Sequence, residues 1–254
     1  MQNREYLNFE GITISSYEYG EFDKIFNILS PHNGIITAII KRIRKTSNKN
    51  FDYIDIFQKM NFKASLSDNF CIIYEAKSLE TWFERPIKLN NLSSGNIIAE
   101  LIINFNSINE NNNYIYHLVS KCMQWISNDI LIFSLVYFQI KLLLAEGIFP
   151  EIDLCLNCNN QLEPDNYLLN LIESGIFCNV CSNQVKFSNI KLLEQEIRLL
   201  KHIKNTEYDE STNLNNKITE KVDLNLYKKL STYIKFYTNR EIKSEKILFT
   251  SLNK

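Results

Sequence analysis

Two short motifs, Cys155-Leu156-Asn157-Cys158 and Cys178-Asn179-Val180-Cys181, dominate the interpretation of this chain. Each CxxC turn presents two thiols from one tight bend, and 19 residues separate the two motifs. That spacing is typical of a zinc ribbon or a related tetrahedral site. We therefore predict one structural Zn²⁺ per chain, held by Cys155, Cys158, Cys178 and Cys181. Four protein ligands leave no position for a catalytic water, so this zinc is expected to support architecture rather than chemistry.

Three other roles for the CxxC pairs remain open at this point: disulfide bonds, a thioredoxin-like redox motif and an iron–sulfur cluster. No βαβ pattern surrounds either pair, and turn residues flank both. The N-terminus lacks the basic start and apolar run of a signal peptide, so we expect a reducing cytoplasm, which favours a metal over disulfides. Cys71 and Cys122 lie in apolar surroundings and are predicted to be core residues.

Composition indicates an ordinary soluble protein. The chain has 254 residues, of which 45% are hydrophobic and 22% charged, enough for two domains or one large domain. The longest apolar stretch without a charge, residues 130–140, has about half the length that crosses a bilayer. We therefore expect a buried helix there and no membrane association.

The charges are distributed unevenly, although the net charge is only −1. Residues 24–51 hold six basic residues and no acidic one, residues 221–254 are also basic, and the chain between them is acidic. Such asymmetry points to an anionic partner, whereas the alternative is two solvated faces. The first basic segment contains the candidate nucleic-acid contacts Lys24, Lys41, Arg42, Arg44, Lys45 and Lys49. The second contains a possible DNA or partner surface, made of Lys228, Lys229, Lys235, Arg240, Lys243 and Lys246.

The first eighty residues have the pattern of a small β-barrel. Alternating or β-branched runs separated by turn residues predict strands over 11–17, 22–29, 35–43, 60–66 and 70–79. Five strands with a basic, irregular connection after the third suit an OB-fold over residues 1–80. OB-folds bind single strands through a cationic groove and exposed aromatic rings. Tyr17, Tyr19, Phe51 and Tyr53 lie near the basic segment, although most aromatic residues of a small barrel belong to its core.

The period becomes helical from about Pro86, which predicts a helical domain over residues 81–254 with a zinc module inserted at 152–188. Ser93-Ser94 is expected to cap the first helix. Further helices are predicted over 114–126, 129–146 and 224–237, and another from apolar residues spaced between Ile190 and Ile203. The predicted fold class is therefore α+β.

No catalytic arrangement is visible, so the chain is not predicted to be an enzyme. The three histidines stand alone, and the chain lacks the GxxxxGK[ST], GxGxxG and GxSxG motifs.

In its order of parts, the chain resembles the RecO family of bacterial DNA repair and recombination-mediator proteins. The residues that carry the resemblance are Tyr19 to Ile25 with the turn at Asn33-Gly34, Phe138 to Pro150 leading into the first CxxC, Gly175 to Cys181, and Arg240 to Leu248. One departure lies after the third predicted strand, where Ile40 to Lys45 keeps the family's basic residues and lacks its glycine.

The resemblance implies a non-enzymatic protein that binds single- and double-stranded DNA and anneals complementary strands. It also implies help in loading recombinase onto strands coated by single-strand-binding protein, in the RecF pathway. The implied partners are RecR and the C-terminal tail of single-strand-binding protein, in the bacterial cytoplasm near the nucleoid. The competing interpretations are a zinc-ribbon scaffold or transcription-related module that binds proteins rather than DNA, and an enzyme with an unrecognised active site.

Overall fold

The computed structural model describes residues 5–43, 54–67, 70–105, 112–162, 167–182, 189–206 and 223–252. Strands and helices both occur there, which confirms the predicted α+β class. The chain divides into two compact units, one made of Met1–Leu131 and Ile242–Lys254, the other of Ile132–Glu241. Among the described helices, none is both long enough and apolar enough to cross a membrane.

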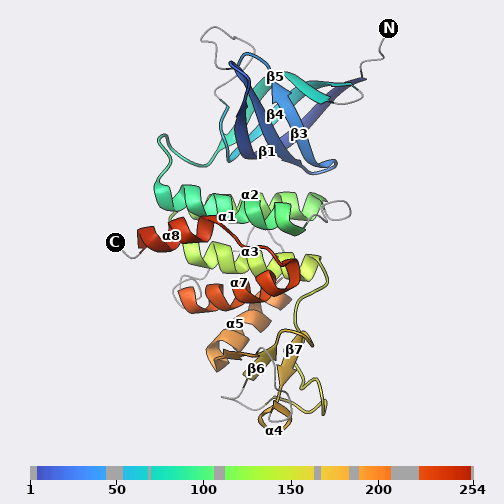
Figure 1. Cartoon of the computed structure of the whole chain (residues 1–254), viewed down its shortest axis with the longest axis vertical. Coiled ribbons are helices and arrows are strands. Elements are labelled where there is room, and N and C mark those ends of the chain that lie inside the picture. The colour runs from blue at the N-terminus through green and yellow to red at the C-terminus, as the bar shows by residue number, and fades with distance from the viewer. Residues whose placement is uncertain are drawn as a thin grey trace. The chain divides into compact units, whose positions relative to one another are not determined.

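The first unit begins with five strands: β1 (Glu5–Tyr19), β2 (Asp23–Ser30), β3 (Gly34–Ile40), β4 (Gln58–Ser67) and β5 (Phe70–Thr81). They pair in the order β1-β2-β3-β5-β4, and β4 pairs with β1 again, so the sheet closes into a barrel (Figure 1). All of these pairings are antiparallel except that of β3 with β5. Each strand expected from the sequence is present, and the assignment of the barrel to the OB-fold stays a prediction.

β1 pairs with two strands of the barrel, β4 and β2. Its first half pairs with β4 and its second half with β2, and Ile12 lies opposite a residue of each. The neighbouring Gly11 lies very close to β2. A Cβ at Gly11 would lie 2.3 Å from Ile28 Cγ2 and 3.1 Å from the Leu29 carbonyl oxygen. Only a residue without a side chain lets β1 approach β2 this closely.

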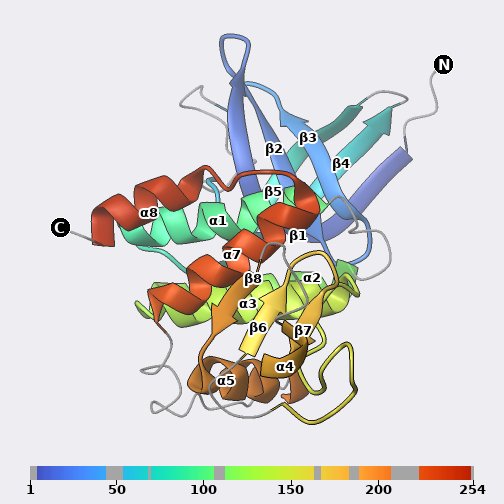
Figure 2. The ribbon, with the colours of Figure 1, turned by 60° about the horizontal axis from the view of Figure 1, so that its bottom comes forward.

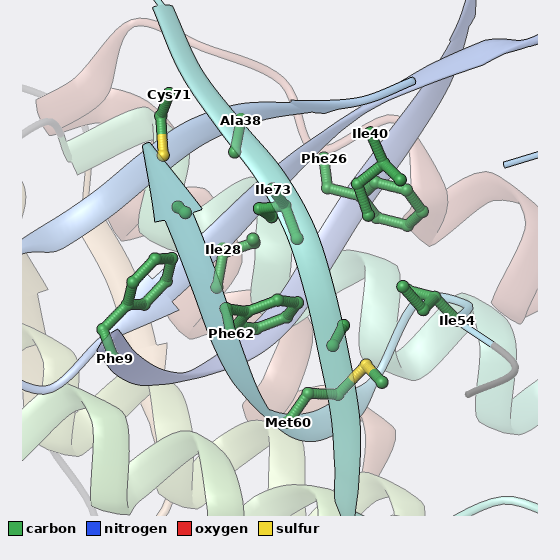
Figure 3. Close-up of a cluster of buried hydrophobic side chains, with 12 residues drawn as sticks. Phe9, Phe26, Ile28, Ala38, Ile40, Ile54, Met60, Phe62, Cys71 and Ile73 are labelled. Carbon is green, nitrogen blue, oxygen red and sulfur yellow. The ribbon is translucent and has the colours of Figure 1, made fainter. Parts of the chain in front are cut away.

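Alternating apolar side chains fill the barrel interior (Figure 3). Phe9 and Phe62 stack there with their ring centroids 5.3 Å apart. Cys71 belongs to this core, and burial raises the pKa of its thiol. Cys122 is buried among apolar helix residues, and burial raises its pKa as well. Both thiols therefore stay neutral and unreactive, as expected for core cysteines.

Three helices complete the described part of the first unit: α1 (Leu89–Phe105), α2 (Asn112–Ser127) and α8 (Ser244–Leu252). α2 is joined to the barrel by Tyr116, whose hydroxyl donates to Glu10 Oε1 at 2.6 Å. α8 lies beside α1, where the Glu100 carboxylate accepts the backbone N–H groups of Lys243 at 2.6 Å and Ser244 at 3.1 Å. A carboxylate at this position stabilises the start of α8 by satisfying N–H groups that have no partner within the helix.

The second unit contains α3 (Leu131–Ala145), β6 (Tyr167–Asn170), β7 (Gly175–Phe177), α4 (Asn179–Ser182), β8 (Asn189–Leu192), α5 (Glu194–Asn205) and α7 (Leu224–Thr238). β6 lies between β7 and β8 in a small antiparallel sheet (Figure 2). Glu196 of α5 is only 3% exposed, and Lys229 of α7 donates to both of its carboxylate oxygens at 2.7 Å. The buried charge thus has a partner, and removing either residue would leave the other uncompensated.

Two local predictions are wrong. α1 begins at Leu89, so Ser93 and Ser94 lie inside the helix and cap nothing; the Ser93 hydroxyl donates to the Leu89 carbonyl at 2.8 Å, one turn back. Ile190 lies in β8 rather than in a helix, because its segment pairs with β6. The helix begins only at Glu194. In both cases the sequence pattern placed the start of the helix at the wrong residue, because tertiary contacts set that boundary.

The predicted domain division between residues 80 and 81 stays a prediction. The compact units group α1, α2 and α8 with the barrel, and they separate α8 from the helices that precede it.

We predict that Gly11→Ala lowers the free energy of unfolding by about 1–3 kcal/mol, because the new methyl group overpacks the space beside Ile28. Chemical denaturation followed by circular dichroism measures this. Gly20→Asn is the matched control, since Gly20 has a φ of +60° but open space around it, and asparagine tolerates this conformation. Equal stability of Gly11→Ala and the natural protein would contradict the proposed close approach.

Candidate metal centre and nucleic-acid interface

The four predicted metal ligands converge in the second unit. The sulfur atoms of Cys155, Cys158, Cys178 and Cys181 all lie within 4.8 Å of one another. None of the six cysteines takes part in a disulfide. Cys155 and Cys181 are buried, whereas Cys158 and Cys178 lie nearer the surface.

Local backbone geometry positions the two pairs. In the first CxxC turn, Asn159 has a φ of 57° and donates its N–H to the Cys155 carbonyl at 2.9 Å. The second pair follows β7 and enters the short helix α4. Leu156 connects the two CxxC segments, because its N–H donates to the Ile176 carbonyl at 3.0 Å. Its side chain also packs on Gly175, where an added Cβ would lie only 2.7 Å from Leu156 Cδ1.

The spacing of the sulfurs fits one tetrahedral ion. Four sulfurs bound to zinc at about 2.3 Å would lie about 3.8 Å apart. The Cys158 and Cys178 sulfurs, from different pairs, are 3.8 Å apart. Sulfur donors alone suit zinc or an iron–sulfur cluster better than magnesium or calcium, which prefer oxygen.

Hydrogen bonds and burial act differently on the thiols of Cys155 and Cys181. Burial raises the pKa of the Cys155 thiol, but backbone N–H groups of Cys158, Cys178 and Asn157 donate to the sulfur and lower its pKa to about 6. The Asn157 amide donates to Cys181 and lowers its pKa, yet the neighbouring Cys178 thiol and burial outweigh it and raise the value to about 11. The surroundings therefore favour the thiolate at Cys155 and disfavour it at Cys181. A bound dication would allow all four to deprotonate.

Charged side chains attach this module to α5. Asp153, two residues before the first ligand, pairs with Lys204 at 2.7 Å and with Lys201 at 3.1 Å. The hydrogen bond from Lys204, which opposes a smaller effect of burial, holds the pKa of Asp153 below its usual range. Just before the module in the chain, the Ile148 carbonyl accepts a hydrogen bond from the Tyr233 hydroxyl of α7 at 2.8 Å. These contacts give the cluster a fixed attachment within the second unit.

A second candidate site lies in the first unit, where β1 ends and β2 begins. Tyr17 and Tyr19 are 51% and 52% exposed, so they are not core residues. Figure 2 shows the β1–β2 hairpin extending beyond the other strands. The register brings Lys24 of β2 opposite Ile40, the last residue of β3, directly before the exposed Lys41 and Arg42.

The hairpin end therefore has two exposed rings and three basic residues near it, but Lys24 lies opposite Glu18, on the other face of the hairpin from Tyr17 and Tyr19. It also carries acidic residues: Glu18 lies opposite Lys24, and Asp23 accepts the backbone N–H of Arg42 at 2.7 Å. The positive charge of this surface comes from the end of β3 rather than from the hairpin tip. Arg44, Lys45, Lys49, Phe51 and Tyr53 lie outside the described residues.

The second set of predicted basic residues is less uniform than its sequence suggests. Lys229 is engaged by Glu196, and Lys235 pairs with Glu241. Lys228, Lys229, Lys235 and Arg240 belong to the second unit, whereas Lys243 and Lys246 belong to the first. A role of these residues in binding DNA or a partner stays a prediction.

One exposed feature escaped the sequence analysis. Tyr6 of β1 and Tyr74 of β5 form an edge-to-face pair with centroids 6.3 Å apart. The two residues are far apart in the chain, and a bulge in β5 helps to align them, so neither strand pattern indicated the pair.

Comparison with known proteins assigns both parts of the chain. The family model described as "Recombination protein O N terminal" matches residues 1–82, and "Recombination protein O C terminal" matches residues 88–246. Proteins named "DNA repair protein RecO" are similar along most of their length. The protein from Clostridium perfringens is 27% identical, covering 94% of this chain and 95% of its own. The protein from Alkaliphilus metalliredigens is 22% identical, with 91% and 93% covered. The protein from Thermoanaerobacter sp. is 26% identical, with 94% and 95% covered.

We predict that elemental analysis of protein purified without chelator finds about one zinc per chain. Cys155→Ser should reduce the zinc content to near zero, because it removes a buried ligand, whereas Cys71→Ser, in the barrel core, should leave the content unchanged. Zinc-free protein with four titratable thiols in the module, or equal zinc in both variants, would contradict the assignment.

Proposed function

Because the chain belongs to the RecO family, whose relatives are named for DNA repair, we propose that it is a DNA-binding recombination mediator. It anneals complementary single strands and helps to load recombinase onto strands coated by single-strand-binding protein. Its first unit carries the DNA site, on a barrel that we assign to the OB-fold. The observation that carries this proposal is the common location of Tyr17, Tyr19, Lys24, Lys41 and Arg42 at one end of that barrel.

The chemistry of these residues suits single-stranded DNA. Lysine and arginine neutralise phosphates without reading sequence, and exposed tyrosine rings stack on bases of any type. Screening of phosphate charge lets two complementary strands approach each other. Contacts of this kind leave the hydrogen-bonding edges of the bases available for pairing, which annealing requires. The residues Arg44, Lys45 and Lys49 extend the same basic segment in the sequence.

The cysteine cluster is assigned a structural role. Cys155, Cys158, Cys178 and Cys181 hold one Zn²⁺, which neutralises the thiolates and fixes the two CxxC turns relative to each other. Because the four thiolates complete its coordination, the zinc takes no part in a reaction and the protein is not an enzyme.

The proposed partners are those that membership of the RecO family implies. They are RecR and the acidic, apolar tail of single-strand-binding protein, together with single- and double-stranded DNA, in the bacterial cytoplasm at the nucleoid. The basic residues of α7 and of the segment 240–246 complement an acidic tail in charge. Pairing of Lys229 and Lys235 with glutamates reduces the charge available there.

We predict that the triple variant Lys24→Ala, Lys41→Ala, Arg42→Ala weakens binding of single-stranded DNA to a similar extent for all sequences. Each lost phosphate contact removes about 0.7 from the slope of log affinity against log salt, so the slope should fall by about 2. Fluorescence anisotropy with labelled oligonucleotides over a salt series measures both quantities.

The matched control for charge is Lys228→Ala, Lys235→Ala, Arg240→Ala, which removes the same charge and leaves the buried Lys229 pair intact. If the barrel variant keeps its fold, affinity and slope, the barrel end is not the DNA site. A protein-binding zinc scaffold would then be the better interpretation.

A further inference from the structure

We propose that the barrel carries a second binding surface for single-stranded nucleic acid, centred on Tyr6 and Tyr74 at the start of β1. The inference rests on the proposed annealing function and extends it, because annealing brings together two strands. One strand would be held at Tyr17 and Tyr19, and the other at Tyr6 and Tyr74.

The two tyrosine rings stand on the wet side of the sheet. Tyr6 is 69% exposed and Tyr74 is 39% exposed. Their edge-to-face arrangement, with an interplanar angle of 84°, presents ring faces in two directions. A base stacks favourably on such a ring, and the stacking tolerates any base sequence because every base has a π-face.

A β-bulge creates this arrangement. Lys63 of β4 lies opposite Glu75, whereas the next residue, Ala64, lies opposite Ile73, so Tyr74 is the extra residue of β5. Bulges redirect side chains, and here both Tyr74 and its neighbour Glu75 avoid the barrel interior, which Ile73 and Ala76 occupy. Without the extra residue, one of them would point into the core.

The surroundings of the ring pair are polar and carry net positive charge. By register, Tyr6 lies opposite Ser65, and Asn8 lies opposite Lys63. Glu75 pairs with Lys63 at 2.9 Å and with Lys77 at 3.5 Å, so two ammonium groups share one carboxylate. Exposed ion pairs of this kind are weak, and a phosphate can replace the carboxylate as partner of either lysine.

This chemistry favours a nucleic acid over a protein as the occupant. A protein-docking surface has an apolar centre with few charges. Here the rings are bordered mostly by polar side chains, of Lys63, Glu75, Asn8 and Ser65, with Ile72 opposite Ser65. Lysines beside exposed rings are the combination with which single-strand-binding surfaces hold phosphates and stack bases.

The two surfaces are separated by the length of one strand. Tyr6 lies next to the first residue of β1, and Tyr17 and Tyr19 lie at its other end. At about 3.3 Å per residue, Tyr6 is at most about 36 Å from Tyr17 and about 43 Å from Tyr19 along the strand. A single chain can therefore hold two short strands without their backbones sharing one groove.

The test is the stoichiometry of oligonucleotide binding. A labelled oligothymidylate of about four nucleotides, titrated at low salt, is too short to bridge the two surfaces and occupies one at a time. The natural protein should bind two oligonucleotides per chain. The variant Tyr6→Ala, Tyr74→Ala should bind one, with affinity for the second reduced about 5- to 150-fold, and should anneal complementary strands more slowly.

Two controls keep the result interpretable. Tyr6→Phe, Tyr74→Phe retains the rings and should keep both sites. Tyr17→Ala, Tyr19→Ala should lose the first site and keep the second. Circular dichroism and thermal unfolding establish that each variant is folded.

The outcomes separate the two proposals. One bound oligonucleotide per natural chain, together with unchanged annealing by Tyr6→Ala, Tyr74→Ala, would overturn the second surface while leaving the proposed function intact. No binding by the natural protein would overturn both.

Discussion

The first unit depends on one strand pairing with two partners. The first half of β1 closes the sheet against β4, and its second half extends against β2. Gly11 permits the close approach of β1 to β2. This closure leaves no edge along the paired segments and forces the two ends of β1 apart. Tyr6 and Tyr17 both lie in paired parts of the strand, opposite Ser65 of β4 and Ile25 of β2, and they are exposed because their side chains lie outside the barrel interior. Glu10, between them, is the acceptor to which α2 attaches through Tyr116.

The second unit brings together groups whose negative charge needs compensation. Four thiolates within 4.8 Å of one another would repel strongly without a cation, because like charges at this distance disfavour ionisation. The same unit contains a buried carboxylate, Glu196, with its own cation, Lys229. Both arrangements join segments that are distant in the chain, and both lose stability when one partner is removed. A metal would therefore contribute to folding of the module as well as to its shape.

The pairing of charges also changes how the basic segments are to be interpreted. In the chain's last hundred residues, Lys201, Lys204, Lys229 and Lys235 all have carboxylate partners. A count of basic residues therefore overestimates the charge that those helices offer to a polyanion. At the barrel, Lys41 and Arg42 are exposed directly after β3, which pairs with β2, the partner of the β1 end that carries Tyr17 and Tyr19. Local arrangement, and not net charge, makes the barrel end the better candidate for DNA.

The sequence by itself determined the five strand segments of the barrel, the main helices, the identity of the four clustered cysteines and the family. These follow from local periodicity and from the spacing of residues that act within one turn. It misplaced the start of α1 and assigned Ile190 to a helix, because helix boundaries depend on what a segment packs against. Only the tertiary structure decided that Tyr17 and Tyr19 are exposed, that Lys229 is engaged by Glu196 and that Tyr6 meets Tyr74. Such contacts depend on strand register and bulges between distant segments, which the period of a single strand does not specify.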